Sequence, residues 1–155
     1  MKSRFLIFTL FLAVICIGSS ATAMGQSVTG TGVFNLGEGG PPLTITVSSN
    51  GGSGGVMRIG EGQSQLIAQP VDQCVQNDPF FGNLAFVVAQ ITNASGSFAG
   101  TEGQFLQFGF VDNGKDGDFV VIPDPFFISP IQIPACDLTI LAALPLDRGG
   151  FQVKP

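Results

Sequence analysis

The sequence contains no histidine, no tryptophan and no tyrosine. The absence of histidine excludes Ser-His-Asp triads, Cys-His pairs and imidazole metal sites, because each of these needs an imidazole ring. A sugar-cleaving enzyme needs two carboxylates set across a cleft, and such clefts commonly use tryptophan or tyrosine as a platform. We therefore expect a protein that is not an enzyme.

Basic residues are also scarce, with 6 lysines and arginines against 11 acidic residues in the chain of 155. An acidic protein repels phosphate backbones, so nucleic acid is not an expected partner. A cation is a more natural ligand than an anion for such a surface. The partner that we expect is an unidentified protein or an extracellular polymer.

The first 23 residues have the three parts of a secretory signal peptide. Lys2 and Arg4 form a basic start, residues 5–17 are almost continuously apolar, and Ala-Thr-Ala at 21–23 offers a small-x-small cleavage site. The apolar run is too short to span a membrane, which takes about 20 residues in a helix. We expect removal of this segment on export, which leaves residues 24–155 as one secreted or periplasmic domain without a membrane span.

Cys74 and Cys136 are the two cysteines that lie outside the expected signal peptide. Two cysteines of one small domain most often form a disulfide in an oxidising compartment. The alternative is a nucleophilic thiol, but the chain has no histidine to activate it. We therefore predict a disulfide between Cys74 and Cys136.

Short apolar segments separated by glycine and proline make up the rest of the sequence, with 22 glycines and 10 prolines in the chain. Residues 43–49 alternate strictly between apolar and polar, which is typical of a strand with one buried face. Residues 84–91 are apolar on both faces, as expected of a central strand in a two-layer core. Eight or more such segments predict an all-β fold, either a two-layer β-sandwich or a jelly roll of short antiparallel strands.

The C-terminal part of the chain is less regular. Prolines punctuate residues 123–134, which predicts an edge or irregular segment because proline removes a backbone donor. Residues 138–144 fit either a short helix capped by Asp137 or a strand, and the sequence leaves this choice open. Asp-Pro-Phe-Phe occurs at 78–81 and again at 124–127. We interpret both as turns that deliver phenylalanine to the core, whereas the alternative is a pair of exposed loops that bind an apolar partner.

The clearest hairpin signal lies in residues 104–122. Two apolar runs flank a turn that reads Asp-Asn-Gly-Lys-Asp-Gly-Asp, and its Asn-Gly and Asp-Gly pairs supply the positive φ angles of hairpin turns. Asp112, Asp116 and Asp118 give this turn the carboxylate oxygens that Ca²⁺ prefers. One interpretation is a calcium site that takes further ligands from elsewhere, since the turn is not an EF-hand loop. The other is a solvated turn whose side chains hydrogen-bond the local backbone.

Three segments resemble motifs of a group of secreted bacterial all-β domains. They are Gly-Ser-Phe-Ala-Gly at 96–100, Phe-Gly-Phe-Val-Asp-Asn-Gly-Lys-Asp-Gly-Asp-Phe at 108–119 and Gly-Gly-Phe-Gln-Val at 149–153. Those domains carry a Phe-x-Val-x-Asp-Asn-Gly-x-x-Gly-x-Asp-x-Phe hairpin and a terminal Gly-Gly-x-Ile/Val-Gln-Val strand, and they often serve as modules of exported proteins. The present chain has one residue fewer between the second glycine and Asp118. The resemblance covers about the last 60 residues, and it implies a fold and an exterior location but no activity.

Two functions from different classes follow from these observations. The first is a structural or interaction module of the cell exterior without catalytic activity. The second is a binding protein that uses the acidic turn for Ca²⁺ or the space between its phenylalanine-rich sheets for an apolar ligand. A cavity of several hundred cubic ångström between the sheets would favour the apolar ligand. No cofactor other than Ca²⁺ is expected.

Overall fold

The computed structural model describes residues 25–37, 39–114, 117–124 and 127–155. The predicted signal peptide and Asp116 lie outside these ranges. The described elements are β1 (Ser27–Phe34), β2 (Leu43–Asn50), β3 (Gly54–Glu61), β4 (Ser64–Asp78), β5 (Gly82–Ser95), η1 (Gly96–Phe98), β6 (Phe105–Asp112), β7 (Phe119–Asp124), β8 (Ile128–Ser129), η3 (Ala135–Asp137), β9 (Thr139–Pro145) and β10 (Arg148–Lys154). Within the described ranges, no helix has the length and apolar character needed to cross a membrane.

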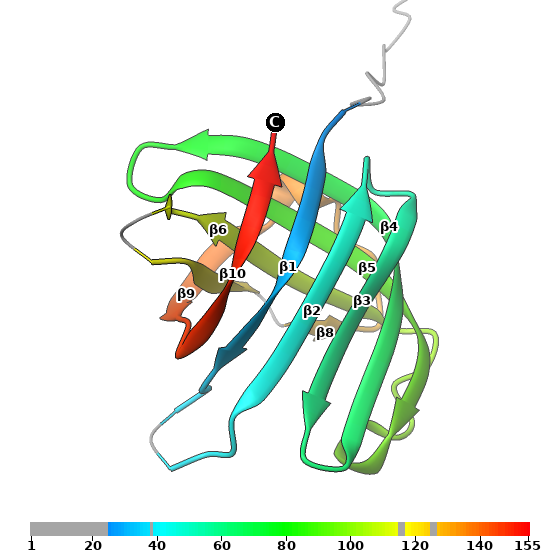
Figure 1. Ribbon diagram of the computed structural model, residues 1–155. Helices are drawn as coiled ribbons and strands as arrows, with labels where there is room; N and C mark the ends of the chain where they lie inside the picture. The colour runs from blue at the N-terminus through cyan, green and yellow to red at the C-terminus, as the bar shows by residue number, and fades with distance from the viewer. Residues whose placement is uncertain (1–24, 38, 115–116, 125–126) are drawn as a thin grey trace, which may run out of the picture.

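The strands form one antiparallel sheet that curls on itself (Figure 1), and apolar side chains fill its interior. Their order is β10-β1-β2-β3-β4-β5-β6-β7-β9, and β8 pairs with β6 outside this path. The prediction of an all-β fold of antiparallel strands is confirmed. The narrower prediction of a sandwich or jelly roll is not confirmed, because strand pairing continues without a break from β10 to β9.

Two of the strand predictions explain how the sheet buries its apolar side chains. In β2, Leu43, Ile45 and Val47 are buried, while the alternate residues face outward. In β5, both faces are buried over residues 84–89. The curled sheet covers one face, and the segment that contains Ala135 and Leu138 packs on the other. The period of two in β2 and the continuous apolar run in β5 therefore report one and two buried faces, as predicted.

The inner face of the sheet holds the larger apolar cluster, which includes Phe34, Ile59, Phe108, Phe110 and Phe151. The second cluster lies on the opposite face of β5 and β6. Its buried members are Leu84, Phe86, Val88, Val111, Val121, Ala135 and Leu138. Ile133, Ala135 and Leu138 belong to this second cluster, so residues 130–138, which include η3, form an irregular covering segment. The irregular segment predicted over 123–134 agrees with this in its last part, whereas Pro123 lies in β7 and Ile128–Ser129 form β8.

The predicted disulfide is confirmed, and it attaches the covering segment to β4. The Cys74 and Cys136 sulfurs are 2.12 Å apart, with their Cα atoms 5.1 Å apart. Beside them, the backbone N–H of Ala135 donates to Oδ2 of Asp72 at 2.8 Å. Because the disulfide joins residues 62 positions apart, restriction of the unfolded chain stabilises the fold by about 4 kcal/mol in the chain-entropy model.

The choice left open for residues 138–144 is decided in favour of a strand. Thr139–Pro145 form β9, which pairs antiparallel with β7, for example at Val121 and Ala143. Without β9, β7 would present its backbone donors and acceptors as a free edge beside the apolar cluster. Asp137 belongs to η3, which ends before β9 begins, so it caps no helix over 138–144.

The interpretation of the Asp-Pro-Phe-Phe turn at 78–81 is half correct. Oδ1 of Asp78 accepts the backbone N–H groups of both Phe80 and Phe81, as a local turn requires. Phe81 packs edge to face against Phe119, with ring centroids 6.3 Å apart. Phe80 is 87% exposed instead, because it is the middle residue of the turn between the paired residues Asp78 and Gly82.

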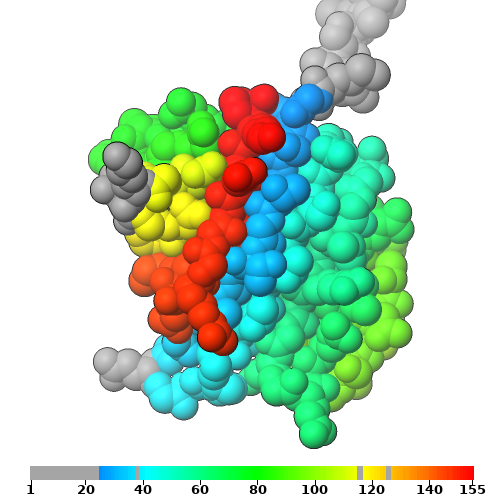
Figure 2. Space-filling view, in the orientation of Figure 1, coloured from blue at the N-terminus to red at the C-terminus, as the bar shows by residue number. Residues whose placement is uncertain are grey.

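The free edge of β10 lies against the β6–β7 hairpin, and we call this contact the seam. Figure 2 shows β10 (red) between β1 (blue) and this hairpin (yellow). The ring of Phe151 crosses the seam, with its centroid 4.9 Å from that of Phe110. A β-carbon at Gly30 or Gly32 of β1 would come within 2.8 or 2.9 Å of the Phe151 ring. These two glycines therefore leave the space that the ring occupies.

Candidate functional site

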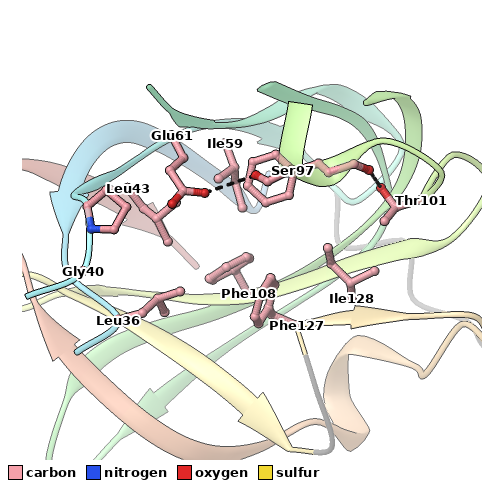
Figure 3. Close-up of a pocket in the computed structure, with 12 residues that line it drawn as sticks. Leu36, Gly40, Leu43, Ile59, Glu61, Ser97, Thr101, Phe108, Phe127 and Ile128 are labelled. Carbon is pink, nitrogen blue, oxygen red and sulfur yellow. Dashed lines mark hydrogen bonds between the residues drawn. The ribbon is translucent and has the colours of Figure 1, made fainter. Parts of the chain in front are cut away.

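The inner apolar cluster opens at one end into a pocket of about 410 Å³ (Figure 3). Two connecting segments border its mouth, namely the β1–β2 connection, which contributes Leu36 and Pro41, and the β5–β6 connection, which contributes Phe98 and Thr101. Leu36 is 50% exposed at this mouth. The pocket is therefore a continuation of the core that remains accessible from outside.

Apolar side chains from both halves of the curled sheet form the walls. Leu43 and Ile59 come from β2 and β3, and Phe108 comes from β6. Phe108 lies opposite Ile59 and beside Phe127, with a centroid distance of 5.6 Å between the two rings (Figure 3). These surfaces favour hydrocarbon or aromatic groups, because burial there removes apolar area from water.

Glu61 introduces a carboxylate into this apolar lining. It is the last residue of β3, where Met57, Ile59 and Glu61 share the inward face of the strand. Its side chain is half-buried and extends along the pocket wall between Leu43 and Ser97 (Figure 3). The inward position follows from the register of β3, in which Ile59 lies opposite Ile45 of β2 and Leu66 of β4.

The η1 turn is tied to the hairpin that carries Glu61. Ser97 donates its hydroxyl to Oε2 of Glu61 at 3.2 Å, and its backbone N–H donates to Oγ of Ser64 at 2.9 Å. Further along, the hydroxyl of Thr101 donates to the carbonyl of Phe98 at 2.8 Å. These bonds fix Phe98 over the pocket and leave the second oxygen of Glu61 for another donor.

The arrangement is suited to binding. It combines a concave apolar surface with one carboxylate and two hydroxyl groups, which is the usual composition of a small-molecule pocket. Apolar walls would hold the body of a ligand, and Glu61 would accept a hydrogen bond from its polar end. The predicted absence of catalysis stays a prediction.

Two of the three carboxylates predicted as calcium ligands lie at the seam. Oδ2 of Asp118 accepts the backbone N–H of Phe151 at 2.6 Å, and Oδ2 of Asp112 accepts that of Val153 at 3.2 Å. Phe151 and Val153 are alternate residues of β10, so both N–H groups point to the same edge. The second oxygen of Asp118 accepts the N–H of Asn113 within the turn at 3.0 Å.

The structure therefore assigns Asp112 and Asp118 a role in fixing β10. Among the described residues, no group of three acidic or cysteine side chains could hold a metal ion. Asp116, the third predicted ligand, is outside the described residues, so the calcium site itself stays a prediction. The local backbone bond at Asn113 is the kind expected of the solvated turn, whereas the bonds to β10 were not anticipated.

The sequence predicted a cavity for an apolar ligand as one alternative but named none of the residues that line it, although one signal pointed to Glu61. The segment Met57-Arg58-Ile59-Gly60-Glu61 alternates with a period of two, which places Glu61 on the same face as two large apolar residues. A carboxylate at an inward position is unusual and often functional. Leu36, Phe98 and Phe127 carried no such signal, because their convergence depends on how separate connections fold over the sheet.

Comparison of the chain with protein-family models, curated proteins and solved structures found no significant match. The resemblance to secreted bacterial all-β domains therefore stays a prediction. Any functional conclusion depends on the geometry of the pocket.

Proposed function

We propose that this protein is an exported binding protein without catalytic activity, whose pocket holds a small and mainly apolar molecule. The observation that carries the proposal is an accessible pocket of about 410 Å³ within the inner apolar cluster. Pockets that bind small molecules have volumes of about 300–1,000 Å³ and mainly apolar linings. Apolar surface of this kind is rarely left in contact with water unless it binds a ligand or a partner.

Two further features support the proposal. The disulfide between Cys74 and Cys136 is typical of proteins in oxidising compartments, which agrees with export through the predicted signal peptide. The inner cluster lies between the two halves of the curled sheet, as in a sandwich whose layers enclose a ligand. On this view the space between the phenylalanine-bearing strands is the binding site.

Titration with N-phenyl-1-naphthylamine, a neutral dye whose fluorescence rises in apolar surroundings, tests the proposal. We expect saturable binding that Leu36→Asp weakens about tenfold, because a charge replaces an apolar contact at the mouth. Leu141→Asp is the matched control, since Leu141 is 61% exposed on β9 and does not line the pocket. Absence of saturable binding, or equal weakening by both substitutions, would contradict the proposed function.

Phe80 favours a second candidate, the structural or interaction module of the cell exterior. It is 87% exposed, the most exposed large apolar side chain among the described residues, and hydrogen bonds from its turn to Asp78 hold it there. Exposed aromatic side chains are enriched where proteins bind partners. We would measure co-sedimentation of the purified protein with cell-surface polymer from its source. Loss of binding in Phe80→Ser, with binding retained in Leu36→Asp, would support this candidate, and no co-sedimentation would exclude it.

A further inference from the structure

We infer that the ligand of the pocket is amphipathic, with an apolar body and a protonated amino group that Glu61 binds. This inference rests on the proposed function and adds the chemical class of the ligand. It depends on three properties of Glu61. These are its position among apolar side chains, the unused hydrogen-bond acceptor capacity of its carboxylate and the charge of its surroundings.

The position of Glu61 makes its carboxylate part of the pocket. Met57, Ile59 and Glu61 follow one another on the inward face of β3, and Leu43 lies beside Glu61 in Figure 3. A charged group is costly to keep beside apolar side chains unless a partner compensates for lost hydration. A ligand cation would supply that compensation once the pocket is filled and water is displaced.

The hydrogen bonding of Glu61 leaves capacity for such a partner. In the described part of the chain, the hydrogen bond that Glu61 accepts from a side chain comes from Ser97, at Oε2. A carboxylate can accept about four hydrogen bonds through its two oxygens. Oε1 is therefore available to a donor within the pocket, while Ser97 fixes the orientation of the carboxylate.

The described basic residues do not neutralise Glu61. Arg58 is three positions away on β3, and strand periodicity places it on the outward face, where it is exposed. Arg148 pairs with Val33 in the ladder between β10 and β1, and Lys154 pairs with Ser27 at the far end of that ladder. None of these three lines the pocket. A positive charge for Glu61 would come from the ligand.

The surroundings also favour a cation over an anion. The formal charge of the whole chain is −5, so long-range electrostatics attract cations and repel carboxylates. The rings of Phe98, Phe108 and Phe127 line the same pocket, and aromatic faces attract ammonium groups. An ammonium ion bound to a carboxylate forms a charge-assisted hydrogen bond, which is stronger than the bond from a neutral hydroxyl.

A purely structural role for Glu61, as the acceptor that fixes Ser97, is the alternative. Glu61→Gln separates the two roles, because the amide oxygen still accepts the Ser97 hydroxyl while the negative charge is lost. Ser97→Ala is the matched variant, since it removes the hydrogen bond to the η1 turn and keeps the charge. A binding role requires Glu61→Gln to change ligand preference, whereas a structural role makes Ser97→Ala the more harmful substitution.

The test is isothermal titration of the full chain with octylamine, octanol and octanoate, which share one chain length and differ in the charge of the head group. At pH 7 we expect octylamine to bind about tenfold more tightly than octanol, and octanoate to bind most weakly. Glu61→Gln should reduce the affinity for octylamine about tenfold and leave that for octanol unchanged. Ser97→Ala should keep the preference for the amine.

The outcomes distinguish this inference from the proposed function. Equal binding of octylamine and octanol, or an equal loss of both in Glu61→Gln, would overturn the inference and leave the apolar pocket as a ligand site. If none of the three compounds binds, and the neutral dye also fails to bind, the proposed function itself is overturned. Tighter binding of octanoate than of octylamine would overturn the inference, because it would show that the pocket prefers an anionic head group.

Discussion

The seam and the mouth of the pocket both place carboxylates beside the inner apolar cluster, but the carboxylates have different partners. At the seam, Asp112 and Asp118 accept backbone N–H groups of β10. At the mouth, Glu61 accepts the hydroxyl of Ser97 through one oxygen. The seam contains the denser acidic motif in the sequence, yet its two aspartates bond the backbone of β10, whereas Glu61 lines the pocket.

A high density of acidic residues in the sequence is therefore a weaker indicator of a ligand-binding site than the place of each carboxylate in the fold and the donors that it bonds. The N–H groups of Phe151 and Val153 lie at the free edge of β10. A buried backbone N–H without an acceptor destabilises the fold, so these two groups need hydrogen-bond acceptors. The two aspartates supply these acceptors and fix the last strand. In the part of the chain that the structure describes, the hydrogen bond to Glu61 comes from the side chain of Ser97, so the sheet depends on Glu61 less.

The largest difference between the two regions should come from Phe151→Ala. Phe151 is 4% exposed and packs across the seam on Phe110. Removing a buried phenyl ring and leaving a cavity destabilises a protein by about 3–5 kcal/mol. Urea unfolding followed by circular dichroism measures the loss. Phe80→Ala is the control, because Phe80 is exposed and its truncation should change the free energy of unfolding by less than about 0.5 kcal/mol. Similar losses for both variants would show that the ring of Phe151 does not hold the seam.

A smaller effect is expected for Asp118→Asn. The amide retains one acceptor oxygen, so one of the N–H groups of Asn113 and Phe151 loses its partner. An unsatisfied donor at a partly buried position costs about 1–3 kcal/mol. The free energy of unfolding should fall by that amount, and hydrogen exchange should accelerate at whichever of the Asn113 and Phe151 amides loses its acceptor.

Asp147→Asn is the control for this substitution, because Asp147 accepts an exposed side-chain hydrogen bond from Asn35. We expect it to change the free energy of unfolding by less than about 0.5 kcal/mol. If the two aspartate variants were equally stable, the hydrogen bond from Phe151 would not be what fixes β10.

Glu61→Gln should have almost no effect on the stability of the ligand-free protein. Glu61 is half-buried, and glutamine keeps an acceptor for Ser97, so the free energy of unfolding should change by less than about 0.5 kcal/mol. Urea unfolding without ligand measures this value. A loss as large as that of Asp118→Asn would mean that the mouth, like the seam, uses its carboxylate to hold the fold.

The addition of calcium should have the smallest effect, and it decides between the two interpretations of the acidic turn. Ca²⁺ takes 6–8 oxygen ligands, whereas Asp112 and Asp118 point oxygens at backbone amides. If these aspartates serve only the backbone, the melting temperature is the same in millimolar CaCl₂ and in EDTA. A calcium-dependent rise in melting temperature, absent in Asp118→Asn, would establish the metal site instead.

Local sequence patterns predicted a large part of the fold. The alternation in β2 and the continuous apolar run of β5 identified strands with one and two buried faces. The choice between helix and strand at 138–144 could not be made locally, because the free edge of β7 decides it. A cavity for an apolar ligand was anticipated, but its lining residues were not, because they come from separate strands and connections. Of the lining residues, Glu61 could have been recognised from the sequence, because it alternates with Met57 and Ile59 along β3 and therefore lies on the inward face of that strand.

Local periodicity was enough to predict the all-β character and the buried faces of the main strands. The pairing of Cys74 with Cys136 was predictable because each had a single candidate partner. The role of each carboxylate followed from the folded chain, which sets Asp112 and Asp118 against the backbone of β10 and Glu61 in the pocket lining. That outcome depends on how the sheet curls, since the curl brings β10 to Asp112 and Asp118 and closes the connections over Glu61. The physical reason is that a carboxylate acquires its role from the donors within hydrogen-bond distance, and strands far apart in the chain supply these donors.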